Sequence, residues 1–177
     1  MTKVTPNKSI EIYFSYSPVD EKLRDELAKH LTSLKREGVI RDWYESKISA
    51  GKERAKEIEK YLNSANIILL LISSDFLDSE ELWEIEVTQA MEKHNKQEAR
   101  VIPVLLRSCV WDSTPFGKLE PLPHNKIPIT SWLNKDEAFT DVVQGIQQAV
   151  KEISGLKEEA EEKKSVPLRK KRLPRIP

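Results

Sequence analysis

The strongest constraint on the fold of this chain is the segment 67–72, which consists of six consecutive large aliphatic residues (Ile-Ile-Leu-Leu-Leu-Ile). A strand with one face in water alternates between apolar and polar residues, whereas a strand that is covered on both faces is apolar throughout. Such strands are typical of the centre of a parallel sheet between two layers of helices. The rest of the chain therefore has to supply helices for both faces.

Strand and helix patterns alternate on both sides of this segment. Further strands are expected at residues 10–15, 39–43 and 101–106, and a short edge strand at 127–130, where Pro128 removes a backbone donor. Amphipathic helices are expected at four places: residues 18–37, the stretch that follows Lys52, residues 79–94 and residues 136–153. We therefore predict an α/β fold, a flavodoxin-like three-layer sandwich with a five-stranded parallel sheet.

Charge divides the chain into two parts. The predicted domain covers residues 8–153, and residues 154–177 are expected to form a charged, proline-containing disordered tail or linker. That tail carries 8 Lys+Arg and 4 Asp+Glu, whereas the whole chain has 29 of each, so the domain itself is mildly acidic. A mildly acidic domain argues against nucleic acid as the main partner.

Other features exclude further classes of protein. No apolar run approaches the roughly 18 residues of a membrane-spanning helix, so no membrane span is expected. The lone cysteine, Cys109, excludes an intramolecular disulfide and makes the cytoplasm the expected location. The sequence contains no glycine-rich phosphate loop and no zinc-ligand spacing, so neither a metal ion nor a resident cofactor is expected.

One carboxylate, that of Glu86, lies within the apolar stripe of the predicted helix 79–94. At about 100° per residue, Leu82 and Ala90 flank it at i−4 and i+4, and Trp83 at i−3 shares its face. Burial of a carboxylate is costly unless the group is paired or has a function. Glu86 is therefore the first candidate for a functional residue. The alternative is that it caps a neighbouring loop or pairs with a lysine or arginine.

Other polar and aromatic candidates follow the ends of predicted strands. Ser15 and Tyr16 end the first strand, Trp43 and Tyr44 end the second, and Glu86 lies on the helix after the third. In open parallel sheets, ligands bind beyond the carboxyl ends of the strands. We therefore expect these residues to gather at one rim of the sheet.

Four motifs occur in a fixed order along the chain. They are residues 12–17 (Ile-Tyr-Phe-Ser-Tyr-Ser), residues 43–51 (Trp-Tyr-Glu-Ser-Lys-Ile-Ser-Ala-Gly), residues 69–73 (Leu-Leu-Leu-Ile-Ser) with the helix through Glu86 and Ala90, and Ser131-Trp132. In this succession and spacing the chain resembles the Toll/interleukin-1 receptor (TIR) domain family, particularly its bacterial members, over residues 8–153. One departure is Ala50, where the family usually has proline.

The resemblance implies two classes of activity. Some TIR domains cleave NAD+ at the nicotinamide–ribose bond (NAD+ glycohydrolase activity) with one glutamate on the helix after the third strand, and that position corresponds to Glu86. Such a domain takes NAD+ as substrate, has other TIR domains as partners in a homo-oligomer, and is activated by self-association in immune or cell-death type signalling. The alternative is a non-catalytic module that signals through homotypic TIR–TIR contacts alone.

The enzyme hypothesis assigns roles to the remaining candidates as substrate-binding residues. Ser15 and Tyr16 would line the floor of the site, and Trp43 and Tyr44 would close over the substrate or form the assembly surface. Catalytic relatives commonly carry an aromatic residue four positions before the glutamate, where it can stack on the substrate. Here that position is Leu82 and the aromatic residue is Trp83, which would either stack on the substrate or pack in the core.

Overall fold

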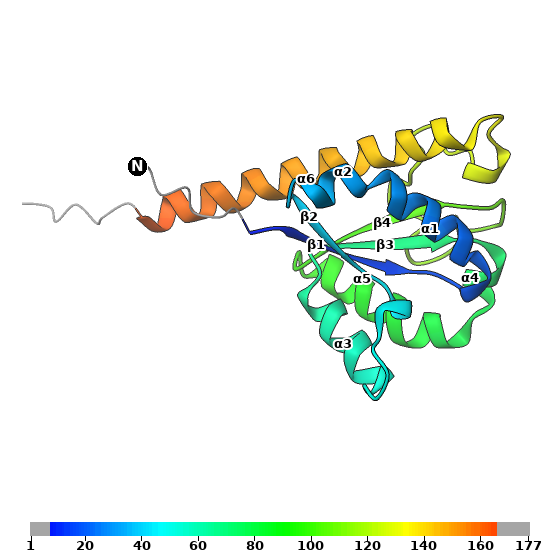
Figure 1. Cartoon of the computed structure of the whole chain (residues 1–177), viewed down its shortest axis with the longest axis horizontal. Coiled ribbons are helices and arrows are strands. Elements are labelled where there is room, and N and C mark those ends of the chain that lie inside the picture. The colour runs from blue at the N-terminus through cyan, green and yellow to red at the C-terminus, as the bar shows by residue number, and fades with distance from the viewer. Residues whose placement is uncertain (1–7, 166–177) are drawn as a thin grey trace, which may run out of the picture.

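The computed structural model describes residues 8–165. Its sheet contains four parallel strands in the order β2-β1-β3-β4 (Figure 1). The strands are β1 (Ile10–Ser15), β2 (Ile40–Trp43), β3 (Ile67–Ile72) and β4 (Arg100–Leu105). This order, with each parallel connection made by helices, is that of the predicted flavodoxin-like sandwich.

Helices cover both faces of this sheet (Figure 1). On one face lie α1 (Glu21–His30), α2 (Thr32–Arg36) and α6 (Lys135–Ser165). On the other face lie α3 (Arg54–Ser64), α4 (Ser74–Asp78), the π-helical turn η3 (Leu82–Val87) and α5 (Thr88–Asn95). Three short 3-10 helices, η1 (Pro18–Asp20), η2 (Glu45–Lys47) and η4 (Ile129–Ser131), lie in the connections.

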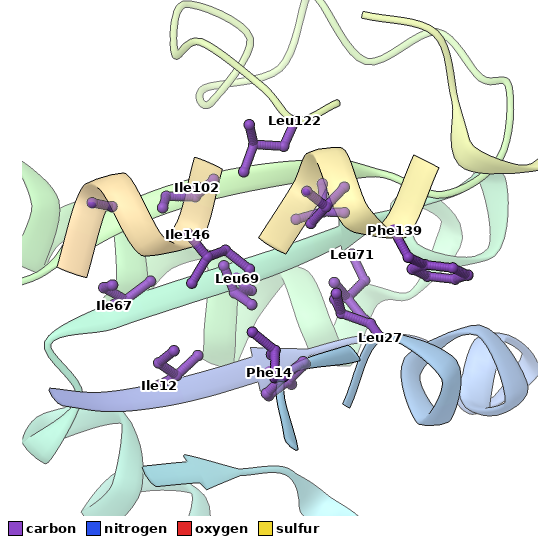
Figure 2. Packing of buried hydrophobic residues seen from close by; sticks show 14 of the residues in the cluster. Ile12, Phe14, Leu27, Ile67, Leu69, Leu71, Ile102, Leu122, Phe139 and Ile146 are labelled. Atoms are coloured by element: carbon purple, nitrogen blue, oxygen red, sulfur yellow. The ribbon is translucent and has the colours of Figure 1, made fainter. Parts of the chain in front are cut away.

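Strand β3 has neighbours on both edges and both faces, and all six of its side chains are fully buried. Ile67, Leu69 and Leu71 join the cluster beneath α1 and α6, which Figure 2 shows with Phe139 and Ile146 of α6. The other three side chains of the strand join the cluster beneath α3 and α5. The structure thus confirms that this continuous apolar strand is buried on both faces, as its sequence predicted.

The prediction of a fifth strand at residues 127–130 is wrong. The segment after β4 pairs with that strand only at Leu122, whose N–H donates to Pro103 O (2.9 Å) and whose carbonyl accepts from Leu105 N (2.8 Å), and residues 127–130 make a single backbone bond to the residue beyond the strand end, from Thr130 N to Leu106 O (3.0 Å). Prolines at positions 121, 123 and 128 lack the N–H groups that a ladder requires, so the pairing does not extend. Residues 129–131 instead form η4.

Helix α6 is longer than predicted, because it continues past residue 153 to Ser165 (Figure 1). Residues 157–164 are lysine, glutamate and alanine, which are strong helix formers, and no proline occurs between Pro128 and Pro167. The first part of the predicted disordered tail is therefore helical, and residues 166–177 lie outside the described residues. Although α6 has 31 residues, neither it nor any other described helix has the length and hydropathy of a membrane span.

We expect Leu69→Ala to destabilise the protein by about 2–5 kcal/mol, because Leu69 is fully buried and its truncation leaves a cavity between β3 and α6. Urea unfolding measures the change. The control is Leu156→Ala, the same truncation at a side chain that is 62% exposed, where the unfolding midpoint should hardly move. Equal effects of the two substitutions would contradict the assignment of the core.

Candidate active site

The carboxylate of Glu86 lies inside the protein, beneath the carboxyl-terminal half of β1. Glu86 is 5% exposed, and its Oε1 accepts a hydrogen bond of 2.5 Å from the hydroxyl of Tyr13, which is itself 1% exposed. Ser15 follows two residues later on β1, so its side chain points to the same face of the sheet as that of Tyr13. The Ser15 hydroxyl is buried and has no hydrogen-bond partner of standard geometry. β1 therefore presents two hydroxyl groups to the helix layer that carries Glu86.

Burial makes this carboxyl an unusual acid. Desolvation raises the pKa of Glu86 from its ordinary 4.5 to about 7, and the negative charge of Glu45 acts in the same direction. Interactions with the hydroxyls of Tyr13 and Ser15, together with the positive charge of Arg54, lower the pKa and offset part of this rise. A carboxyl with this pKa is present in both protonation states near neutral pH.

A second buried carboxylate, Asp20, has its charge compensated by neighbouring side chains and so differs from Glu86. Asp20 is 3% exposed, and it forms a salt bridge of 2.8 Å with Arg107 Nε and accepts a hydrogen bond from the hydroxyl of Ser73. These contacts join η1 to the segments that follow β3 and β4. Glu86, in contrast, forms no salt bridge with any residue between 8 and 165. The possibility that Glu86 is a directly ion-paired structural residue is therefore not realised in the described part of the chain.

Charged residues bridge three elements near Glu86. Arg54, the first residue of α3, forms a salt bridge of 2.7 Å with Glu45 of η2 and a second one with Glu81, which precedes η3. All three side chains are at least 31% exposed, so each pair contributes less than about 1 kcal/mol to stability. The cluster nevertheless joins the loop after β2 to both helical elements beside the carboxylate.

The π-helical turn explains the positions of Leu82 and Trp83. Within η3 the N–H of Thr88 donates to the carbonyl of Trp83, an i→i+5 bond, so the regular spacing expected for residues 79–94 does not hold there. Trp83 packs against Phe116, with ring centroids 5.9 Å apart, and Leu82 is buried in the apolar cluster beneath α3 and α5. Both residues have packing contacts, and their contact with a substrate stays a prediction.

The structure divides the predicted rim residues into two groups on opposite faces of the sheet. Trp43 lies on the face of Glu86, where it is 8% exposed and stacks between Tyr13 (5.2 Å) and Tyr61 (4.5 Å). Tyr16 and Tyr44 pack on the face of α1. The expectation that Ser15 and Tyr16 together line one floor does not agree with this arrangement, because successive strand residues point to opposite faces.

Tyr16 and Tyr44 are held by a buried arginine of α1, Arg24. Its side chain is 3% exposed, its Nη1 donates to Tyr16 Oη (3.1 Å) and Ser46 Oγ (2.7 Å), and its guanidinium lies 3.8 Å from the ring centroid of Tyr44. Asp42, paired with Lys35 (3.0 Å) and Lys47 (2.7 Å), fixes the same loop at its start. Arg24 thus anchors the loop after β2 to the helix layer opposite Glu86.

Two residues of this site, Tyr13 and Arg54, were not among the candidates from sequence. Tyr13 had a recognisable signal, because it lies two residues before Ser15 in a strand and shares its face. Arg54 had none, since its pairing with Glu45 and Glu81 depends on how three separate elements pack.

The fold and site together define an α/β domain whose three-layer sandwich encloses, near the strand ends, a buried carboxyl that forms no salt bridge with any residue between 8 and 165. The sequence model described as "TIR domain" matches residues 12–144, three quarters of the chain. The chain therefore belongs to the TIR domain family, which confirms the family predicted from its motifs.

Similar proteins agree with this membership. An uncharacterised protein of Sinorhizobium fredii (strain NBRC 101917 / NGR234), y4lF, is 46% identical over 138 residues, which are 78% of this chain and 43% of that protein. The chain thus spans less than half the length of this curated relative. The TIR domain of the Toll-related receptor TRR-2 from Hydra magnipapillata has a TM-score of 0.51 at 17% identity and covers 79% of this chain and 97% of its own.

A further solved structure with the same fold is the activated Roq1 resistosome, which directly recognises the pathogen effector XopQ. Its TIR domains have a TM-score of 0.54 at 19% identity and cover 78% of this chain and 99% of their own. At such identities the two solved structures establish the fold that they share with this chain.

We expect Glu86→Gln to stabilise the protein above neutral pH. Because the folded-state pKa of about 7 exceeds the ordinary 4.5, the folded protein holds this proton more tightly than the unfolded chain does. The contribution of Glu86 to the free energy of unfolding is therefore fully present below about pH 4.5, and it is lost as the pH rises through about 7. The difference in unfolding free energy between variant and wild type should grow across that window by roughly 3 kcal/mol in urea titrations.

The matched control for this measurement is Glu84→Gln, the same chemical change on the exposed side of η3. Because its side chain is exposed, Glu84→Gln should change the unfolding free energy by no more than about 0.5 kcal/mol. A difference between Glu86→Gln and the wild type that does not change with pH would contradict a raised pKa at Glu86.

We expect Arg24→Ala to loosen the loop after β2 without unfolding the sheet, because the substitution removes the contacts to Tyr44 and Ser46. Hydrogen exchange should become faster at the N–H groups of Lys47 and Ile48, which close η2. Arg36→Ala, at an exposed position of α2, serves as the control. Unchanged exchange in Arg24→Ala would show that the loop does not depend on this arginine.

Proposed function

We propose that this TIR domain cleaves NAD+ at the nicotinamide–ribose bond, with Glu86 as the catalytic carboxylate, when several copies associate. The observation that carries the proposal is a buried carboxyl, without a direct cationic partner among the described residues, whose pKa is about 7. Such a group is costly for stability, and perturbed acids of this kind are concentrated at functional sites. Family membership supplies the reaction to which it fits.

The chemistry requires one carboxylate. As the bond from C1′ of the ribose to the nicotinamide nitrogen breaks, the electron pair leaves with nicotinamide, which becomes neutral, and positive charge develops on the sugar. The ionised carboxylate of Glu86 stabilises that charge. When water is the acceptor, its oxygen bonds to C1′, and the proton that it loses passes to a base such as Glu86. Because the nicotinamide ring of NAD+ is already cationic before the bond breaks, it leaves as a neutral molecule and no second carboxylic acid is needed to protonate it.

Association of copies is part of the proposal because the site is closed in the single chain. Glu86 is only 5% exposed, and the Arg54 pairs with Glu45 and Glu81 join the elements around it. A substrate therefore reaches the carboxylate only after these elements move, and contacts between domains can supply the required free energy. The TIR domains of Roq1 occur in an activated assembly, which supports the same arrangement here. The proposal includes a signalling role in the cytoplasm, which membership of the TIR family supports.

The test is NAD+ consumption by the purified chain over increasing protein concentration, with light scattering to follow association. The wild type should cleave NAD+ with a rate that rises faster than protein concentration, and Glu86→Ala should lose on the order of 100-fold or more of that activity. Glu84→Ala is the control, because Glu84 is exposed on the same turn and should keep the wild-type rate.

The packing of Trp43 and Trp83 favours a second candidate, a non-catalytic module that signals by homotypic contacts. Trp43 is buried and stacked between Tyr13 and Tyr61, so in the single chain its ring forms no open wall for a substrate, and Trp83 packs against Phe116. This candidate predicts association without any NAD+ consumption, and the same association in Glu86→Ala. If the wild type associates with rising concentration but cleaves no NAD+, the non-catalytic module becomes the supported function and the enzyme hypothesis is rejected.

A further inference from the structure

The hydroxyl of Tyr13 occupies a defined place beside the candidate catalytic group. Both Tyr13 and Glu86 are at least 95% buried, and the 2.5 Å bond joins the phenol to Oε1 of the carboxylate. Oε2 accepts no hydrogen bond of standard geometry from any residue between 8 and 165. The two oxygens of Glu86 therefore differ: Oε1 is held by the protein, whereas Oε2 is not held by such a bond within the described residues.

The ring that carries this hydroxyl cannot move freely. Tyr13 is paired in register with both Trp43 of β2 and Ile68 of β3, so its backbone lies in the middle of the sheet. Its ring stacks on Trp43 at 5.2 Å, and Trp43 in turn stacks on Tyr61 of α3 with an interplanar angle of 12°. A hydroxyl fixed by strand and stack imposes its own direction on the flexible glutamate side chain, which has three rotatable bonds.

We propose that Tyr13 is a positioning residue that holds Oε1 of Glu86 and thereby directs Oε2 toward the ribose of the substrate. The catalytic consequence rests on the proposed function, whereas the coupling between the two side chains does not. A donated hydrogen bond also favours the charged form of its acceptor, so the same hydroxyl keeps more of the carboxyl ionised.

The other groups that face Glu86 do not replace this contact. Glu45 from η2 repels the charged carboxylate, and Arg54 from α3 attracts it but is already paired with two glutamates. The hydroxyl of Ser15 from β1 also lowers the pKa of Glu86, but it forms no hydrogen bond of standard geometry that would hold either oxygen in place. Burial and the neighbouring carboxylate raise the pKa of Tyr13, so its proton stays on the phenol oxygen at every working pH. Tyr13 is consequently a permanent donor.

The first test measures the coupling directly and needs no activity. In protein labelled with 13C at the glutamate side-chain carboxyl, the resonance of Glu86 is assigned by its loss in Glu86→Gln and then titrated. Tyr13→Phe should raise the midpoint of this titration, because it removes a donor and keeps the ring. Tyr61→Phe removes a hydroxyl from the same stack and should leave the midpoint unchanged. An unchanged midpoint in Tyr13→Phe would overturn the proposal.

The second test is the pH profile of NAD+ cleavage by the associated full chain. In Tyr13→Phe the acid limb of kcat should move to higher pH in step with the titration, kcat below pH 7 should fall by roughly tenfold, and KM should stay within about twofold. A merely structural role would reduce the active fraction equally at every pH, and that result would contradict positioning.

The two proposals fail in different ways. A wild type without NAD+ cleavage at any concentration would remove the proposed function and leave the titration to decide the coupling. Normal wild-type cleavage with an unshifted profile in Tyr13→Phe would remove the positioning role alone.

If circular dichroism shows that Tyr13→Phe does not fold, 3-fluorotyrosine incorporated at position 13 provides a stronger donor of nearly the same shape. It should lower the midpoint of Glu86, and an unchanged midpoint would again overturn the proposal.

Discussion

The burial of β3 on both faces is the constraint on which the rest of the structure depends. Its six side chains are excluded from water only because α1 and α6 cover one face while α3 and α5 cover the other. Parallel neighbours require crossover connections, and these connections are the helices that provide the cover. The same connections bring the segments that follow β1, β2 and β3 to one end of the sheet, where Glu86 lies next to β1.

Asp20 and Glu86, two buried carboxylates among the described residues, differ in how they affect the stability of the fold. Asp20 is paired with Arg107 and Ser73, so its charge is compensated and it ties loops together. Glu86 receives one strong hydrogen bond and keeps a pKa of about 7, which means that the fold bears an unfavourable charge at neutral pH. Retaining such a group lowers the free energy of unfolding of the domain at neutral pH, and a cost of this kind is common at functional sites.

The sequence predicted the features that depend on local periodicity, namely the apolar central strand, the amphipathic helices and the burial of Glu86 between apolar neighbours. Features that depend on how elements meet were not predicted: the bond from Tyr13, the ion pairs of Arg54 and the missing fifth strand. The period of two would have separated Ser15 from Tyr16, because adjacent residues of a strand face opposite helix layers. The π-helical turn has no sequence signature of its own, so the regular-helix angle between Trp83 and Glu86 did not apply.

That turn has a consequence for how the site can be rearranged. Successive residues of a helix differ in direction by about 100°, so one additional residue in a hydrogen-bonded ring rotates everything before it relative to everything after it. If the extra residue moved out of the segment between Trp83 and Glu86, the direction of the Trp83 side chain would rotate by about 100° relative to that of Glu86, with no change of rotamer in either. The angle between indole and carboxylate is therefore a property of the backbone register. A ligand that contacts both groups from one side would therefore favour a different position of the extra residue in the helix, and neither side chain would need to change its rotamer.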